Sequence, residues 1–558
     1  MHTSRSRSLR VAAALGAAAV ALAGCADSQR DEPSAGGGGE SSGAEGGTFV
    51  FAGSSDPSSL DPAFASDGET FRPARQMFEG LVGTKPGTAD PAPLLATEWE
   101  TAEDGLSTTF TLRDDVTFHD GETFDAEAVC ANFDRWYNFT GLLQSENLSY
   151  YYGKLFRGFA DTDPKGIYES CTAEDATTAT IELNKPFAAF VQAMSLPAFA
   201  MQSPKAMEQY DADNVGGTAD DPRFSEYASA HPTGTGPFTF EKWERGQQIS
   251  MLRNDDYWGD KPKVDKVILR FIQDPNARRQ ALVNGEIDGY DLVAPGDLKG
   301  LEEDGFTVEN RDPFNILYLA FNQAVPELQD LKVRQAIAHA IDKDAVVSQS
   351  LPEGSEVAVT FQPQSVAGWT DDVPTYDYDV EKAKALLAEA GQTGLTLEFN
   401  YPTGVSRPYM PTPEDTFVAI RSQLAAAGIK VTPVADQWNP DYLDKVTGSD
   451  KHGIHLLGWT GDYNDTDNFL GVFFGQKTDE WGFENPELFS ALTEARGVPT
   501  REEQTPLYEE INKQVMEFLP GIPIAHPVPS LAFAPGVEGY QTSPVQDEVW
   551  NDVTVEEE

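Results

Sequence analysis

Three consecutive stretches of the chain decide its fold class: LTLEFNY (residues 395–401), EDTFVAIRSQLAAA (residues 414–427) and IKVTPV (residues 429–434). The first and third are short and carry the branched and aromatic residues that strands favour. The second is long enough for a helix, and Gly428 follows it as a stop signal. Because a helix between two strands is typical of a crossover connection, this region predicts an α/β sheet with largely parallel strands.

The same alternation of strands and helices extends outward from these stretches. The chain has 558 residues, which is too long for one hydrophobic core and predicts two or three domains. Strand and helix patterns start afresh near residue 313. The main expected elements are strands at residues 48–52, 316–321 and 453–459, helices at 71–81, 332–350 and 501–519, and a hairpin of residues 107–112 and 116–121. Asp125 and Asp379 are predicted to cap further helices.

Composition excludes several classes of protein. Hydrophobic residues make up 40% of the chain and aromatic residues 11%, as in ordinary globular proteins, which excludes a wholly disordered chain, a collagen or a coiled coil. Lys and Arg number 40 against 90 Asp and Glu, giving a formal charge of −50. A surface this acidic argues against nucleic-acid binding, which needs basic patches. The acidity indicates solubility or, alternatively, selection of cationic ligands.

The N-terminus predicts export and lipid anchoring. Arg5, Arg7 and Arg10 precede an apolar run, residues 11–24, that is too short to cross a bilayer and suits a signal peptide. The run ends in Leu-Ala-Gly before Cys25, which resembles a bacterial lipobox. The alternative is an ordinary signal peptide followed by an incidental cysteine. Residues 25–47 are rich in Gly, Ser, Glu and Asp and are expected to form a flexible tether after the signal peptide of residues 1–24.

Two further cysteines, Cys130 and Cys171, remain. Outside the cytoplasm a disulfide between them is favoured, and two buried thiols are the alternative. Two cysteines alone make a poor metal site.

The sequence carries no recognisable catalytic or metal motif. Its seven histidines are scattered, and there is no His-Glu-x-x-His, Gly-x-Ser-x-Gly or phosphate-binding loop. His452 and His455 have no nearby third ligand for zinc. The acidic stretch from Asp462 lacks the Gly and Glu that a calcium loop needs at its sixth and twelfth positions. We therefore expect no cofactor, no metal and no enzymatic activity, although a triad assembled in space stays open.

Four blocks in order give a more specific signal. They are PLLATEWE (residues 93–100) with FTLRDDVTFHDG (110–121), GTGPF (234–238) with NDDYWG (254–259), VRQAI (333–337) with AIDK (340–343), and GWTGDYND (458–465). Together they resemble family 5 extracellular solute-binding proteins, the peptide/nickel class that serves ABC importers. The resemblance covers about residues 48–545.

The resemblance implies an α/β fold: a two-lobed, hinged, periplasmic-binding-protein-like clamp with an extra subdomain. The implied segments are lobe I at residues 48–85, 228–312 and 526–558, the extra subdomain at 86–227, and lobe II at 313–525. The fresh start near residue 313 agrees with the beginning of lobe II. Cys130 and Cys171 then both fall in the extra subdomain.

The resemblance also implies ligand-binding residues. In peptide-binding members an Asp three residues after a Trp pairs with the ligand's ammonium, and the matching residues here are Asp462 and Trp459. A similar Arg-Pro-Tyr segment carries an Arg that pairs with the ligand carboxylate, which corresponds to Arg407. Ser58 and Ser59 are expected to supply backbone contacts. The alternatives are a turn at Asp462, a structural or surface role for Arg407 and a core position for Trp459.

The expected function follows from this pair of charges. A buried site for a peptide zwitterion must pair both its ammonium and its carboxylate. We expect a monomeric, lipid-anchored receptor on the extracytoplasmic face of a bacterial membrane. It would capture di- to oligopeptides and deliver them to ABC transporter permease subunits. A receptor for oligosaccharides or nickel chelates is the alternative within the family, and an extracellular hydrolase is the alternative from another class.

Overall fold

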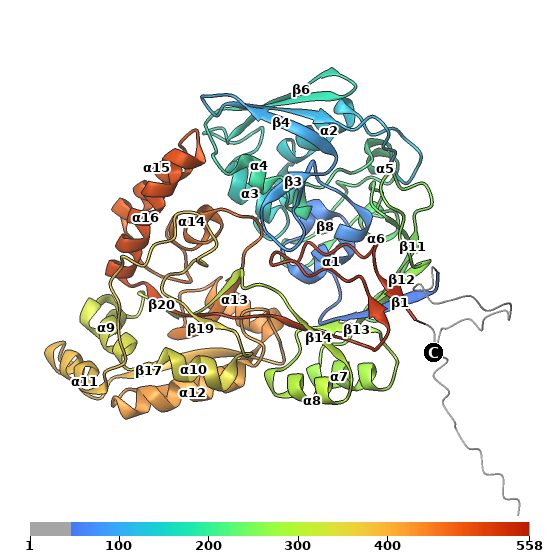
Figure 1. Ribbon diagram of the computed structural model, residues 1–558. Helices are drawn as coiled ribbons and strands as arrows, with labels where there is room; N and C mark the ends of the chain where they lie inside the picture. The colour runs from blue at the N-terminus through green and yellow to red at the C-terminus, as the bar shows by residue number, and fades with distance from the viewer. Residues whose placement is uncertain (1–45, 557–558) are drawn as a thin grey trace, which may run out of the picture. The chain divides into compact units, whose positions relative to one another are not determined.

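The computed structural model, shown in Figure 1, describes residues 46–556 apart from the side chains of residues 439 and 440. The predicted signal peptide, Cys25 and the tether up to residue 45 lie outside the described residues. The last two residues of the predicted tether already contact the folded part, since the Gly46 N–H donates to the Lys263 carbonyl at 2.7 Å. Within residues 46–556, every helix is too short or too polar to cross a membrane.

A seven-stranded sheet forms the part that we call lobe I. Its strands are, in spatial order, β10 (Phe238–Glu244), β11 (Gln248–Arg253), β12 (Lys266–Phe271), β1 (Thr48–Gly53), β13 (Gly289–Asp291), β21 (Ser530–Phe533) and β14 (Thr307–Asn310). Figure 1 shows blue β1 beside green β12 and near red β21, so distant parts of the chain share this sheet. The lobe I helices are α1 (Gly68–Met77), α6 (Tyr227–Ala230), α7 (Pro275–Val283) and α8 (Leu298–Glu303).

Strand β1 shows how both faces of this sheet are buried. Its alternating side chains point to opposite sides. Phe49 and Phe51 enter a core with Met77 of α1, whereas Val50 and Ala52 join a separate core that includes residues of α7 and α8. Accordingly, α1 and the pair α7–α8 lie on opposite sides of β13 (Figure 1). Helix α1 begins three residues earlier than predicted because the Asp67 side chain accepts from the N–H groups of its first turn.

A six-stranded sheet forms lobe II. Its order is β16 (Glu356–Val357), β20 (Gly521–His526), β15 (Asn315–Phe321), β19 (Ile454–Thr460), β17 (Thr396–Thr403) and β18 (Lys430–Gln437). The prediction of a largely parallel sheet is wrong, because only the β17–β18 and β17–β19 pairs are parallel. The chain enters this sheet from lobe I through β15 and returns through β20. These two strands run antiparallel because both connections, at residues 311–314 and 527–529, lie at the same end.

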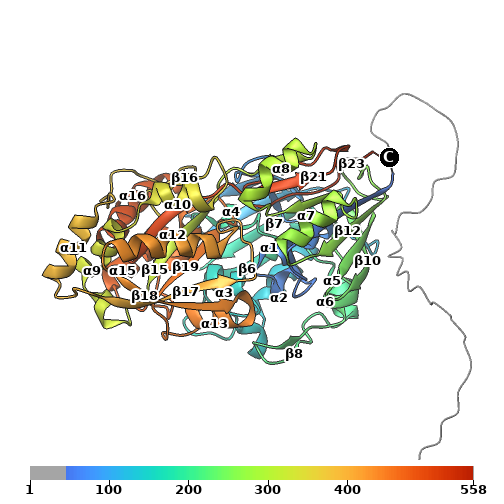
Figure 2. The ribbon, with the colours of Figure 1, turned by 90° about the horizontal axis from the view of Figure 1, so that it is seen from below.

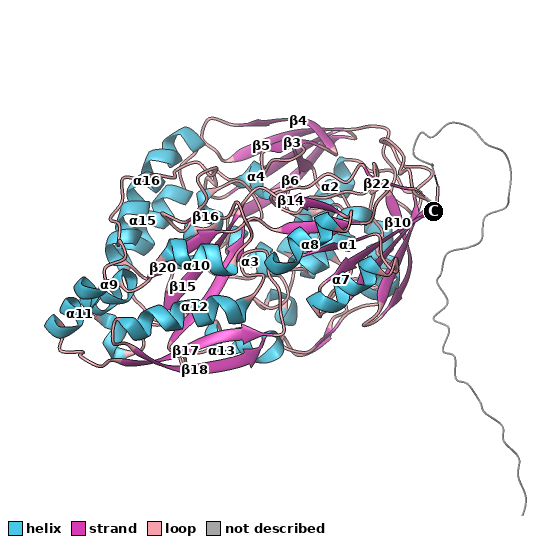
Figure 3. Ribbon diagram, turned by 60° about the horizontal axis from the view of Figure 1, so that its bottom comes forward, coloured by secondary structure: helices cyan, strands magenta, loops and turns pink. Residues whose placement is uncertain are grey.

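The lobe II helices flank this sheet. They are α9 (Leu331–His339), α10 (Lys343–Ser350), α11 (Val380–Glu389), α12 (Pro413–Ala426), α13 (Leu443–Val446), α14 (Leu470–Phe474), α15 (Pro486–Arg496) and α16 (Arg501–Phe518). Helices α10 and α12 lie side by side (Figure 2) and cover one face of the sheet (Figure 3). Gly428, after α12, has a φ of +84°, which glycine adopts without strain.

The single helix predicted at residues 332–350 is wrong, because α9 and α10 are separate. Asp342 leaves the helical conformation and caps α10 by accepting from the Ala345 N–H at 3.0 Å. Its own N–H donates to the Gln423 side chain of α12 at 2.7 Å. The break is therefore fixed by a residue that is distant in sequence.

The extra subdomain is built on a four-stranded antiparallel sheet. Its order is β4 (Ala96–Thr101), β5 (Ser107–Leu112), β7 (Thr178–Leu183) and β6 (Tyr168–Asp175). Its helices are α2 (Ala126–Tyr137), α3 (Tyr150–Phe156), α4 (Phe190–Ala193) and α5 (Pro204–Gln209). The predicted hairpin with residues 116–121 is wrong, since β4 and β7 occupy both edges of β5. The predicted caps are confirmed: Asp125 accepts from α2 and Asp379 from α11.

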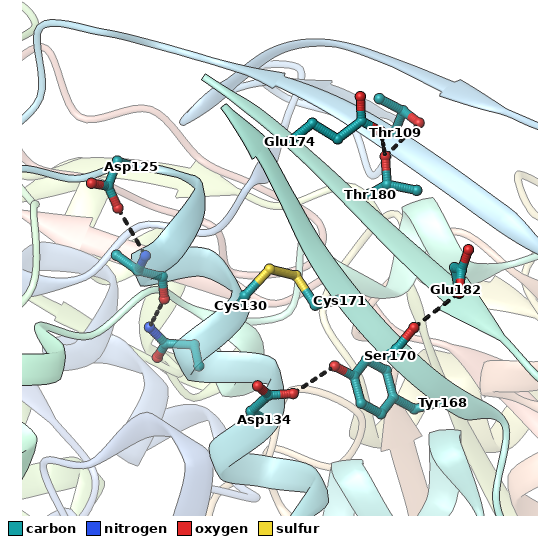
Figure 4. The surroundings of a disulfide bond; sticks show 12 residues. Thr109, Asp125, Cys130, Asp134, Tyr168, Ser170, Cys171, Glu174, Thr180 and Glu182 are labelled. Atoms are coloured by element: carbon teal, nitrogen blue, oxygen red, sulfur yellow. Dashed lines mark hydrogen bonds between the residues drawn. A yellow bond between two sulfur atoms is a disulfide. The ribbon is translucent and has the colours of Figure 1, made fainter. Parts of the chain in front are cut away.

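A disulfide joins Cys130 of α2 to Cys171 of β6, with their Cα atoms 5.2 Å apart (Figure 4). Nearby, the Tyr168 hydroxyl donates to the Asp134 carboxylate at 3.0 Å, so helix and strand are also tied by a hydrogen bond. Three two-stranded antiparallel sheets complete the described strands: β2 (Val82–Thr84) with β3 (Pro91–Pro93), β8 (Gly216–Gly217) with β9 (Pro222–Arg223), and β22 (Val537–Glu538) with β23 (Thr554–Val555). The residue boundaries between lobe I, the extra subdomain and lobe II are a proposal.

Candidate ligand-binding site

Strand β19 and the loop that follows it carry two of the predicted ligand-binding residues, Trp459 and Asp462. The strand ends at Thr460, and the Gly461 N–H donates to the Phe314 carbonyl at 2.7 Å. A Cβ at Gly461 would lie 2.4 Å from the Phe314 ring, so only glycine lets the chain leave the strand here. This close approach sets the start of the loop, residues 461–469, that carries Asp462.

Asp462 is half-buried and held by hydrogen bonds on both its main chain and its side chain. Its N–H donates to Asn468 Oδ1 at 2.8 Å, and Asn468 Nδ2 donates back to the carboxylate at 3.2 Å. Tyr151 of α3 also interacts electrostatically with this carboxylate. Burial raises the pKa of Asp462 to about 6, and the hydrogen bond from Asn468, the interaction with Tyr151 and the charge of Arg75 counteract this effect.

Trp459 shares a partner with Asp462. Its indole Nε1 donates to Asn468 Oδ1 at 3.4 Å, and its ring is half-buried with an edge contact to Phe473 at 6.3 Å. Asn468 therefore joins two of the predicted ligand-binding residues.

Arg407 lies in a tight turn whose main chain pairs with Met410. Its guanidinium carbon lies 4.2 Å from the centre of the Trp438 ring, and its Nε is buried with no hydrogen-bond partner in the described part of the chain. No carboxylate within residues 46–556 pairs with it. Arg407 is thus a half-buried cation with an aromatic support and unused donor capacity.

The turn that carries Arg407 packs directly on β19. The ring of Tyr409 lies so close to Gly458 that a Cβ there would be 2.3 Å away from it. Gly458 immediately precedes Trp459. The two segments named by the resemblance therefore meet at this glycine.

Ser58 and Ser59 are already engaged in local contacts. The Ser58 N–H donates to Thr70 Oγ1 at 3.1 Å, and Ser59 Oγ accepts from the Asp61 N–H at 3.0 Å. Ser58 is exposed and Ser59 is buried. The structure records no contact of either serine with Asp462, Trp459 or Arg407.

Sequence reasoning missed Tyr151 and Arg75, which both act on Asp462 from outside its loop. The Arg75 guanidinium lies 5.6 Å from the Phe71 ring centre, and that ring lies 5.7 Å from the ring of Tyr151. Arg75 is itself paired with Asp547 at 3.5 Å. A run of three tyrosines at 150–152 was the available signal, since clustered aromatic residues favour binding sites as well as cores.

A pocket of about 550 Å³ borders the same loop. The extra-subdomain side is lined by Asp90 and Gln192, and the lobe II side by Trp369, Asn464 and Arg501 among others. It contains none of the five residues predicted to bind ligand. Within the described residues, no group of three or more His, Cys, Asp or Glu side chains is arranged to hold a metal ion.

Comparison with known proteins identifies the family. The model described as bacterial extracellular solute-binding proteins, family 5 middle, matches residues 90–481. The chain therefore belongs to this family of solute-binding proteins. The resemblance stated from the sequence is confirmed.

Two known proteins and two solved structures illustrate the likeness. Heme-binding protein A of Haemophilus influenzae is 29% identical over 98% of this chain and 99% of its own. The dipeptide-binding protein of Escherichia coli is 29% identical over 91% of this chain and 95% of its own. The binding protein DppA of Helicobacter pylori, in complex with the peptide STSA, has a TM-score of 0.77 at 28% identity, covering 92% and 99% of the two chains. The dipeptide-binding protein of Pseudoalteromonas, in complex with Met-Leu, has a TM-score of 0.78 at 26% identity, covering 91% and 100%. The predicted two-lobed α/β fold is confirmed.

Proposed function

We propose that the protein captures peptides by their α-ammonium group and delivers them to the permease subunits of an ABC importer. The observation that carries this proposal is Asp462. Its carboxylate is half-buried, yet within residues 46–556 no Lys, Arg or His lies at ion-pairing distance from it. A ligand ammonium would supply the missing cation and favour the ionised carboxylate.

Arg407 is proposed to receive the ligand's carboxylate. A guanidinium can bind a carboxylate through two parallel hydrogen bonds, and such charged bonds contribute roughly 1.5–3 kcal/mol each. The unpartnered Nε of Arg407 supports this role. Trp459, three residues before Asp462, is proposed to contact the ligand. Ser58 and Ser59 are proposed to supply main-chain contacts to the ligand.

The ligands in the complexes of similar proteins support the peptide class. The Helicobacter pylori protein holds a tetrapeptide and the Pseudoalteromonas protein a dipeptide. We infer that di- to oligopeptides are the ligands here. The lipid anchor at Cys25, the extracytoplasmic location and the monomeric state are further parts of this proposal, resting on the sequence.

A thermal-shift screen tests the ligand class. The purified protein is heated with di- to pentapeptides, their N-acetylated forms, cello-oligosaccharides, haemin and nickel with histidine. A ligand at about a thousand times its dissociation constant stabilises a protein by about 4 kcal/mol. We expect a shift with free peptides and none with N-acetylated ones. Shifts with sugars, haemin or nickel and none with peptides would contradict the proposal.

A further inference from the structure

Arg496, the last residue of α15, makes two charge-assisted contacts in different parts of the molecule. Its Nη1 donates to Asp467 Oδ2 at 2.5 Å, and its Nη2 donates to the main-chain carbonyl of Leu155 at 2.6 Å. The guanidinium also lies 4.4 Å from the centre of the Phe187 ring. Arg496 is only 5% exposed, so these contacts are screened little by solvent.

Both hydrogen-bond partners of Arg496 belong to elements that build the surroundings of Asp462. Asp467 lies in the same loop, five residues after Asp462. Leu155 lies in α3, one helical turn after Tyr151, which interacts with the Asp462 carboxylate. One guanidinium therefore links the loop that carries Asp462 to the helix that carries Tyr151.

Other contacts show that the loop and the extra subdomain are packed together here. Tyr463, next to Asp462, is 1% exposed and belongs to the hydrophobic core of the extra subdomain. Asn464 Nδ2 donates to Asp90 Oδ1 at 3.0 Å. The loop is thus embedded between the two parts, and Arg496 is one of the charged residues at that junction, as is Arg501, whose Nη1 donates to the Asn464 carbonyl at 2.7 Å.

We propose that Arg496 is a positioning residue for ligand capture: it sets the Tyr151–Asp462 contact by holding α3 and the loop in one geometry. This inference rests on the proposed function, in which Asp462 pairs with the ligand's ammonium. Arg496 itself touches neither Asp462 nor the ligand. Its role is to fix where the carboxylate lies before the ligand arrives.

The chemistry of the junction requires arginine. A planar guanidinium offers donors in two fixed directions, whereas a lysine ammonium is a single point charge on a flexible stem. The site also leaves little freedom to Asp467, since a Cβ at Gly471 would lie 2.0 Å from its Oδ1. Arg496→Lys therefore keeps the charge opposite Asp467 but loses the simultaneous bond to the Leu155 carbonyl.

The test compares Arg496→Lys with a matched control, Arg334→Lys. Arg334 is also buried in lobe II and likewise donates to main-chain carbonyls, those of Leu328, Gln329, Phe518 and Leu519, without contact to the loop. Calorimetry measures the affinity for trialanine, and hydrogen exchange measures opening of residues 150–156 and 461–469 in the ligand-free protein. Asp462→Asn is measured in parallel.

We expect Arg496→Lys to weaken trialanine binding about tenfold and to speed exchange in both segments, while Arg334→Lys leaves both unchanged. Unchanged affinity in Arg496→Lys, while Asp462→Asn loses binding, would overturn the positioning role. If Asp462→Asn also keeps full affinity, the proposed function fails instead. In that case, unchanged hydrogen exchange of residues 150–156 and 461–469 in Arg496→Lys would also overturn the inference that Arg496 links α3 to the loop. Should Arg496→Lys fail to fold, Asp467→Asn serves as a milder variant, because its amide oxygen can still accept from Arg496. We expect Asp467→Asn to weaken trialanine binding about threefold. Unchanged affinity in this variant would contradict the inference.

Discussion

The two residues proposed to hold the ends of a peptide lie in very different surroundings. Asp462 accepts a hydrogen bond from Asn468 of its own loop and interacts with Tyr151 of the extra subdomain. Within residues 46–556, the Arg407 guanidinium lies over the face of the Trp438 ring, and its buried Nε has no hydrogen-bond partner. The carboxylate is thus prearranged by two parts of the molecule, whereas the guanidinium is held by one.

This difference has a consequence for ligand choice. A prearranged group binds with less loss of conformational entropy, so the ammonium end should contribute more to affinity. Arg407 has a long side chain that no hydrogen bond or ion pair holds within residues 46–556, so its guanidinium can meet carboxylates at more than one distance. We infer that the ammonium end is fixed and that the carboxylate end tolerates variation in peptide length.

Asp462→Ala should have the largest effect on peptide binding of the changes considered. Removing the partner of a desolvated ammonium should weaken peptide binding by about 2–5 kcal/mol, measured by calorimetry with trialanine. Asp371→Ala, at an exposed aspartate of lobe II, serves as the control and should change nothing. An Asp462→Ala variant with full affinity would show that the loop is not the ammonium site.

The pH dependence of binding should follow the same carboxyl group. The pKa of Asp462 is raised to about 6 by burial, so the free protein must lose a proton there to pair with an ammonium. Affinity should fall about tenfold for each pH unit below 6, and again above about pH 8 as the peptide ammonium deprotonates. In Asp462→Asn the fall in affinity below pH 6 should disappear. If the fall persists in this variant, another group is responsible for it.

Arg407→Leu should have a smaller effect that depends on the ligand. We expect a loss of about 1–2 kcal/mol for a dipeptide and less for a pentapeptide, with none for C-amidated peptides. Arg421→Leu is the matched control, because Arg421 also lies over an aromatic ring, Phe417, at 5.9 Å. Equal losses for free and amidated peptides would mean that Arg407 has only a structural role.

The smallest expected effect is on the stability of the ligand-free protein. A carboxyl group whose pKa is raised on folding stabilises the fold below its ordinary pKa near 4, and this contribution is lost as the pH rises through about 6. Asp462→Asn, which cannot ionise, should therefore be more stable than the natural chain by about 1–2 kcal/mol at pH 8 and equal to it at pH 4. Urea unfolding at both values measures this difference. A variant that is less stable at pH 8 would show that the ionised carboxylate is adequately paired without ligand.

Local features of the site could be predicted from the sequence. The strand before Asp462 follows from its apolar run, whereas the close approach of the Phe314 ring to Gly461 is seen only in the structure. The motif around Trp459 and Asp462 placed both residues at one strand end, where the structure joins them through Asn468.

Contacts between distant segments could not be predicted in the same way. Tyr151 and Arg496 reach the Asp462 loop from other elements, and only the folded chain brings them together. The break between α9 and α10 has the same origin, since Gln423 of a third helix takes up the N–H of Asp342. The antiparallel half of the lobe II sheet likewise depends on where the chain crosses between lobes, which no local pattern encodes.

The most direct test of ammonium capture is a cycle of two changes, one in the ligand and one in the protein. The affinities of trialanine and N-acetyl-trialanine are measured by calorimetry for the natural chain and for Asp462→Asn. We predict that acetylation weakens binding to the natural chain by about 2 kcal/mol or more and has little further effect in the variant, since both changes remove the same ion pair. Equal losses on acetylation in the two proteins would contradict the assignment of Asp462 to the ammonium end.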